Sequence, residues 1–209
     1  DADAGFAFDG DADRVIATDE RGNIVDGDRI MGICAKAMKA QGRLKKDTLV
    51  VTVMSNIGLK KRMTELGINV AETKVGDRYV LEEMLKEGYS IGGEQSGHVI
   101  FLDKNTTGDG MLTAIQVLDV MKSTGRRMSA LANDIPIYPQ VLVNVIVDNE
   151  IKHQAMEDQD LWQRIREVEG KLGSSFRHRA NNPCYAGGAE YRRNKRLCNI
   201  YSKGAGAEV

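Results

Sequence analysis

The stretch DTLVVTVMSNIGLKKRMTELGINVAETKV, residues 47–75, contains a strand, a helix and a second strand in direct succession. Residues 47–55 form a continuous apolar run rich in β-branched side chains, which is typical of a strand buried on both faces in a parallel sheet. Residues 56–67 have the spacing of a short helix, and residues 68–75 again have the pattern of a strand. This order of elements predicts an α/β fold.

The same alternation of strands and helices extends over residues 24–135. It predicts one α/β domain with a mainly parallel, mixed sheet and helices on both faces. Pro136 and Pro139 interrupt the pattern, so we expect a boundary there, followed by a partial α+β domain that begins with a long strand. The remaining elements expected in the first domain are helices at 26–44, 76–88 and 108–125, and a strand, glycine-rich loop and strand at 89–103.

The composition narrows the classes of partner. Lys and Arg number 29 against 30 Asp and Glu, so the charge balance predicts neither nucleic acid nor an anionic membrane as partner. No apolar run approaches the roughly 20 residues that a membrane-spanning helix needs. The 3 cysteines are odd in number and lack zinc-site spacing, which favours a reducing compartment, and we therefore expect the cytoplasm.

Three carboxylates alternate in the segment FDGDADR, residues 8–14, between two strand-like runs at 5–8 and 14–18. Asp9, Asp11 and Asp13 repel one another unless a cation neutralises them. A Mg²⁺ site is one interpretation, with Arg14 as a phosphate contact. An EF-hand is a second interpretation, although Arg14 stands where that loop needs glycine. A solvated acidic turn is the third.

Several motifs together resemble the α-D-phosphohexomutase family. FDGDADR resembles the metal-binding loop of that family, and GGEQSGHVIFLD, residues 92–103, resembles its sugar-recognition loop. VMSN, VGDRYV and NTTGDG are similar to the bacterial branch that acts on glucosamine phosphates. The resemblance extends from about residue 5 to about residue 148.

Members of this family have four domains, and a phosphoserine in the first donates its phosphoryl group to the sugar phosphate. The resemblance implies that residues 1–24 end the second domain, 25–137 form the third and 138–209 the fourth. The Ser-His-Asn-Pro pattern of the phosphoserine loop is absent, so we expect a fragment that is inactive alone. The full-length protein would interconvert glucosamine 6-phosphate and glucosamine 1-phosphate through a bisphosphate, as a homodimer.

The resemblance also implies roles for individual residues of the acidic segment. Asp9, Asp11 and Asp13 would hold Mg²⁺ against the phosphoserine, and Arg14 would contact the same phosphate. Physical chemistry supports these roles, because phosphoryl transfer depends on positioning and on neutralised charge.

Five further residues are candidates for contacts with the sugar or with a phosphate, and four of them lie in the loop that resembles the sugar-recognition loop of the family. Glu94 and Ser96 would bind sugar hydroxyls, and Gln95 favours the amino-sugar branch. His98 would transfer a proton near the reacting hydroxyl. Arg78, at a predicted helix start, would meet a phosphate. From the residues alone, the loop also fits a polar turn, His98 a structural hydrogen-bonding residue and Arg78 a surface arginine.

Two alternatives for function stay open. A phosphomannomutase or phosphoglucomutase would use the same chemistry on another sugar, and a non-catalytic sugar-phosphate or metal-binding module is a different class. The segment 176–196 carries 6 Lys or Arg against Glu190 and no apolar periodicity. It predicts a disordered basic tail or a shifted reading frame, and with either we expect weak sugar-phosphate binding.

Overall fold

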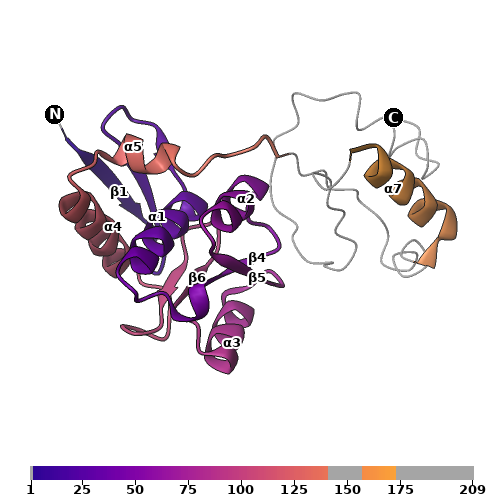
Figure 1. Ribbon diagram of the computed structural model, residues 1–209, viewed down its shortest axis with the longest axis horizontal. Coiled ribbons are helices and arrows are strands. Elements are labelled where there is room, and N and C mark those ends of the chain that lie inside the picture. The colour runs from indigo at the N-terminus through magenta and orange to yellow at the C-terminus, as the bar shows by residue number, and fades with distance from the viewer. Residues whose placement is uncertain (1, 141–156, 173–209) are drawn as a thin grey trace. The chain divides into compact units, whose positions relative to one another are not determined.

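The computed structural model describes residues 2–140 and 157–172 (Figure 1). The chain divides into two compact units, Asp1–Pro139 and Gln140–Val209. In the second unit, the structure describes helix α7 (Gln159–Leu172). The strand expected directly after Pro139 and the atypical segment from 176 lie outside the described residues. The domain boundaries at 24 and 137 stay predictions.

A four-stranded sheet in the order β5-β4-β6-β7 lies at the centre of the first unit. Strand β4 (Thr48–Thr52) pairs in parallel with β5 (Asn69–Thr73) and with β6 (Ile91–Gly93). Strand β7 (Val99–Phe101) pairs antiparallel with β6. All five residues of β4 are buried, as its continuous apolar run requires. The prediction of a mainly parallel, mixed sheet is therefore confirmed.

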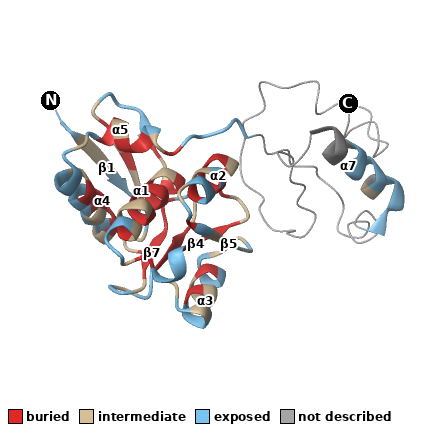
Figure 2. Cartoon of the chain, in the orientation of Figure 1, coloured by how far each residue is buried: buried red, intermediate tan, exposed pale blue. Residues whose placement is uncertain are grey.

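Helices cover both faces of this sheet, as the sequence predicts. Successive residues of β4 point to opposite faces, because side chains alternate across a strand. Leu49 and Val51 join the larger core cluster, whereas Val50 packs in a smaller cluster under α3. Figure 2 shows buried residues in the sheet and in α1, and exposed residues on α3 and α4. The larger cluster contains residues of α1 (Gly27–Ala40), α2 (Ile57–Glu65) and α4 (Gly110–Thr124), and the smaller one contains residues of α3 (Asp77–Glu87).

A second, antiparallel sheet precedes the first in the chain. Strands β1 (Ala4–Phe8) and β2 (Val15–Asp19) pair as a hairpin, and the short β3 (Ile24–Val25) pairs with β2. Strand β2 contacts α4 and the short helix α5 (Met128–Asn133), so the hairpin belongs to the same compact unit as the larger sheet. The sequence predicts neither β3 nor α5, nor the 3₁₀ turn at Lys45–Asp47.

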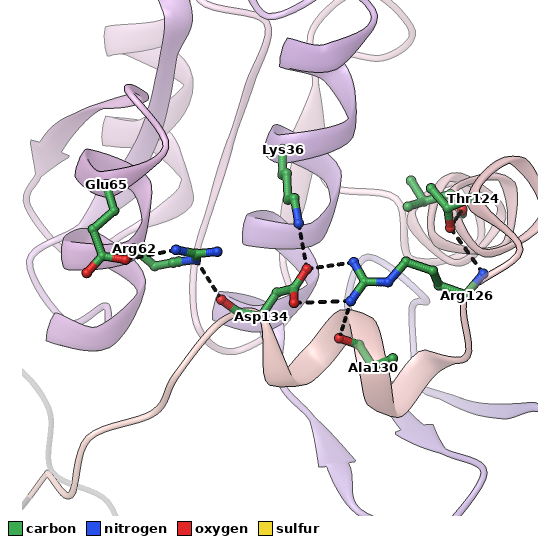
Figure 3. A network of polar contacts seen from close by, with 8 residues as sticks. Lys36, Arg62, Glu65, Thr124, Arg126, Ala130 and Asp134 are labelled. Carbon is green, nitrogen blue, oxygen red and sulfur yellow. Dashed lines mark hydrogen bonds and ion pairs between the residues drawn. The ribbon is translucent and has the colours of Figure 1, made fainter.

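Residues 134–138 lie at the C-terminal end of the first unit. We call these residues, together with the side chains that hydrogen-bond to them, the C-terminal anchor. The Asp134 carboxylate accepts from Lys36 Nζ at 2.5 Å and from Arg126 at 2.6 and 3.1 Å (Figure 3). Arg62 Nε donates to the Asp134 carbonyl oxygen at 3.0 Å. Hydrogen bonds from Arg126 and then Lys36 lower the pKa of Asp134 to about 2.

The other half of the C-terminal anchor begins at the N-cap of α2. The Asn56 amide donates to the Tyr138 carbonyl oxygen at 2.8 Å and accepts from the Tyr138 N–H at 3.0 Å. The fully buried Asp28 in turn accepts from the Asn56 N–H at 2.6 Å. Burial raises the pKa of the Asp28 carboxyl to about 6.

Candidate functional site

The acidic loop, residues 9–14, connects β1 to β2. Carboxylate oxygens of Asp9, Asp11 and Asp13 lie within 4.8 Å of one another, the one such convergence among residues 2–140 and 157–172. Arg14 Nε lies 3.8 Å from Asp9 and 3.7 Å from Asp13. Three carboxylates thus face one guanidinium, which leaves an excess of negative charge on oxygen ligands of the kind that Mg²⁺ prefers.

The flanks and shape of the acidic loop decide between its two metal interpretations. The loop joins two antiparallel strands rather than two helices, so the EF-hand alternative is wrong. Ala12 has φ 57°, an uncommon conformation for a residue other than glycine. The Gly110 N–H at the start of α4 donates to the Ala12 carbonyl oxygen at 2.8 Å and holds this conformation.

The sugar loop, residues 94–98, connects β6 to β7 and lies directly against the hairpin. The Val15 N–H donates to the Gly97 carbonyl oxygen at 3.2 Å. The Gly27 N–H, at the start of α1, donates to the Gln95 carbonyl oxygen at 3.1 Å. The fold therefore brings together the two longest motifs of the sequence.

His98 lies at the junction of these two loops and is 3% exposed. Its Nδ1 lies 3.0 Å from Asp13 Oδ2, and its Nε2 accepts from the Gly108 N–H at 3.1 Å. Both ring nitrogens are therefore engaged within the protein. This arrangement leaves neither nitrogen open to a substrate hydroxyl, so the geometry favours a positioning role over the proton transfer that the sequence predicts.

The other predicted sugar-binding side chains differ in their surroundings. Glu94 is half-buried, and its Oε1 accepts from the Gly76 N–H at 3.0 Å, at the start of α3. Ser96 is exposed. The Gln95 amide points to the Asp26 carboxylate at 3.4 Å, beside the start of α1, and so gives no support to the predicted contact with an amino sugar.

Arg78 lies in the first turn of α3, as predicted, but its side chain is 81% exposed. Its Nε donates to Glu82 on the same helix at 2.7 Å, and this hydrogen bond raises the pKa of the guanidinium. The contact corresponds to the surface-arginine alternative. A phosphate contact would require Arg78 to leave Glu82.

Sequence reasoning missed the residues that join the two loops. Gly108 and Gly110 hold His98 and Ala12 through their backbone N–H groups, and Gly76 holds Glu94. The segment NTTGDG carries the available signal, because two glycines flank Asp109, the N-cap of α4. The sequence shows that a helix starts there, but not that both glycines approach loops distant in the chain.

Comparisons with known proteins agree with this fold. The family model "Phosphoglucomutase/phosphomannomutase, alpha/beta/alpha domain III" matches residues 26–138, more than half of the 209 residues. The phosphoglucosamine mutase of Caldanaerobacter subterraneus subsp. tengcongensis is 60% identical over 171 residues, which are 82% of this chain and 38% of that protein.

Two solved structures share the fold. A phosphoglucomutase/phosphomannomutase family protein from Burkholderia thailandensis is 29% identical, with a TM-score of 0.58, over 65% of this chain and 29% of its own. The N-acetylphosphoglucosamine mutase of Aspergillus fumigatus, solved with GlcNAc-6P and magnesium, is 19% identical, with a TM-score of 0.62, over 79% of this chain and 40% of its own.

The chain therefore belongs to the phosphoglucomutase/phosphomannomutase family, and its predicted resemblance to the phosphohexomutases is confirmed. It spans 38% of the length of its Caldanaerobacter relative, a phosphoglucosamine mutase. Within the part of the chain that the structure describes, every helix is too short or too polar to cross a membrane.

Proposed function

We propose that the full-length protein is a Mg²⁺-dependent phosphoglucosamine mutase that interconverts glucosamine 6-phosphate and glucosamine 1-phosphate in the cytoplasm. The observation that carries the proposal is the direct contact between the acidic loop and the sugar loop through Asp13 and His98, at 3.0 Å. The relatives support the amino sugar as substrate, since proteins 58 and 60% identical carry the name phosphoglucosamine mutase.

Asp9, Asp11 and Asp13 would hold the metal, because their convergent oxygens and excess negative charge fit a hard divalent cation. A bound Mg²⁺ would supply positive charge against the phosphate. The Arg14 guanidinium, with a side chain 50% exposed, is available to donate to the same phosphate. The loop as a whole would therefore bind the charged end of the substrate.

The sugar loop would bind the hydroxyl groups of the hexosamine. The Glu94 carboxylate is fixed through Oε1 by the Gly76 N–H, which leaves Oε2 to accept from a hydroxyl. The exposed Ser96 hydroxyl can donate to or accept from the sugar. The phosphoserine that would donate the phosphoryl group, and return it by way of a bisphosphate, is not among these 209 residues.

Substrate comparison tests the proposal on a protein of the full length of its relatives. We expect kcat/KM for glucosamine 6-phosphate to exceed kcat/KM for glucose and mannose phosphates. A preference for glucose or mannose phosphate would favour the family alternative, and no turnover of any of them would favour a binding module.

The Glu94→Ala variant tests the sugar loop in the same assay. We expect it to lose about 1–3 kcal/mol of transition-state stabilisation, read from kcat/KM. Glu94→Gln is the matched control for folding, since its amide oxygen can still accept from the Gly76 N–H. Equal activity of wild type and Glu94→Ala would contradict the role of Glu94.

A further inference from the structure

The hydrogen bonds of His98 fix which ring nitrogen carries the proton. A backbone N–H can only donate, so Nε2, 3.1 Å from the Gly108 nitrogen, must be the acceptor. The ring proton then sits on Nδ1 and is donated to Asp13 Oδ2 at 3.0 Å. His98 is therefore oriented by Gly108 on one side and orients a carboxylate of the acidic loop on the other.

The His98 ring packs directly against the backbone of Gly108, where there is no room for a side chain. A Cβ atom added at Gly108 would lie 2.4–2.6 Å from the ring atoms Cε1, Nε2 and Nδ1, closer than atoms can approach. Glycine at this position therefore allows the backbone to support the ring directly. The ring is also almost completely buried, so water does not compete for either nitrogen.

We propose that His98 is a positioning residue for the metal site, an inference that rests on the proposed function. By fixing one oxygen of Asp13, it holds the carboxylate in the orientation that converges with Asp9 and Asp11. Hydrogen-bonded partners of this kind orient metal ligands, and losing one costs about 10- to 100-fold in metal affinity.

The same contact couples the sugar loop to the metal site. His98 lies in the same loop as Glu94 and Ser96, and a backbone hydrogen bond joins the first and the last residue of that loop. The Glu94 N–H donates to the His98 carbonyl oxygen at 2.9 Å. The sugar loop and the acidic loop are therefore joined through His98 and Asp13.

Two substitutions of His98 separate its two hydrogen bonds. Asparagine places an amide N–H near the position of Nδ1, so His98→Asn keeps a donor to Asp13. Glutamine reaches the position of Nε2, so His98→Gln keeps an acceptor for Gly108 and loses the donor to Asp13. Gly108→Ala is a third variant that displaces the intact ring.

Metal binding to the full 209-residue chain is the readout, with Mg²⁺ in calorimetry and Mn²⁺ in electron paramagnetic resonance. We expect His98→Gln and Gly108→Ala to weaken binding by about 10- to 100-fold, and His98→Asn to remain close to wild type. Circular dichroism without metal verifies that each variant folds. If a His98 variant does not fold, the Mg²⁺ affinity of Gly108→Ala tests the positioning role instead.

Three results would overturn the inference: equal affinity in wild type and in the folded variants, equal loss in His98→Asn and His98→Gln, or absence of metal binding to the wild-type chain. These measurements use no sugar. If the predicted order of affinities is found but the full-length protein does not turn over glucosamine phosphates, the proposed function fails while the positioning role stands.

Discussion

The acidic loop and the C-terminal anchor both depend on carboxylates, but they balance charge in opposite ways. In the anchor, Asp134 has two cationic partners, Lys36 and Arg126, at 2.5–3.1 Å. In the loop, three carboxylates share one guanidinium, and its Nε lies 3.7–3.8 Å from two of them. The carboxylate of the anchor is neutralised within the protein, whereas the three carboxylates of the loop have only one guanidinium beside them.

This difference separates a structural cluster from a candidate binding site. A carboxylate with two hydrogen-bonded cations stabilises the fold, and the lowered pKa of Asp134 expresses that stabilisation. Convergent carboxylates without enough positive charge repel one another and are better satisfied by an external cation. Substitutions in the two regions should therefore affect different measurements.

Asp11→Asn should produce the largest effect, because it removes a proposed ligand. Loss of a residue that only hydrogen-bonds to a metal ligand typically lowers metal affinity by about 10- to 100-fold, and we expect loss of the ligand itself to lower Mg²⁺ affinity further. Turnover by the full-length protein should fall as well. The free energy of unfolding without metal should hardly change. Calorimetry with Mg²⁺ measures the first quantity and urea denaturation the last.

Asp103→Asn is the matched control for Asp11→Asn. It removes one carboxylate that pairs with Arg43 at 3.1 Å and lies outside the acidic loop. We expect its Mg²⁺ affinity to equal that of wild type. If both variants bind Mg²⁺ as wild type does, the acidic loop is a solvated turn.

Asp28→Asn should change how the stability of the anchor depends on pH. Burial raises the pKa of Asp28 to about 6, so its contribution is fully present below pH of about 4 and is lost as pH rises through about 6. Relative to the variant, wild type should lose up to about 3 kcal/mol of unfolding free energy between these limits. Urea denaturation at pH 4–8 measures this, and parallel pH profiles would contradict it.

Asp134→Asn should show the smaller, opposite dependence. Hydrogen bonds lower the pKa of Asp134 to about 2, so its contribution is present above pH of about 4 and is lost as pH falls through about 2. We expect the variant to lose about 2 kcal/mol of unfolding free energy at pH 7. Its Mg²⁺ affinity should equal that of wild type. Urea denaturation and Mg²⁺ calorimetry measure the two quantities.

Glu65→Gln is the control for Asp134→Asn, because it removes an exposed partner of Arg62 at 2.9 Å. Exposed pairs contribute roughly 0.2–1 kcal/mol, so this variant should stay close to wild type. A reduced Mg²⁺ affinity in Asp134→Asn would show that the two regions are not independent.

The amino-acid sequence by itself determined the local elements and their order. The β-branched run at 47–55 predicted a strand buried on both faces, and the alternate aspartates favoured a cation site between two strands. It did not reveal β3 or α5, because two and six residues are too few to show a period.

Only the tertiary structure decided how these elements meet. His98 and Asp13 are 85 residues apart in the chain, yet their side chains lie 3.0 Å apart. Likewise, Lys36 of α1 donates a hydrogen bond to Asp134, which lies 98 residues further along the chain. Sequence patterns report which face of an element is apolar, whereas such contacts depend on the register and packing of two sheets. For that reason the sequence predicted the acidic loop, and the fold alone showed which histidine contacts it.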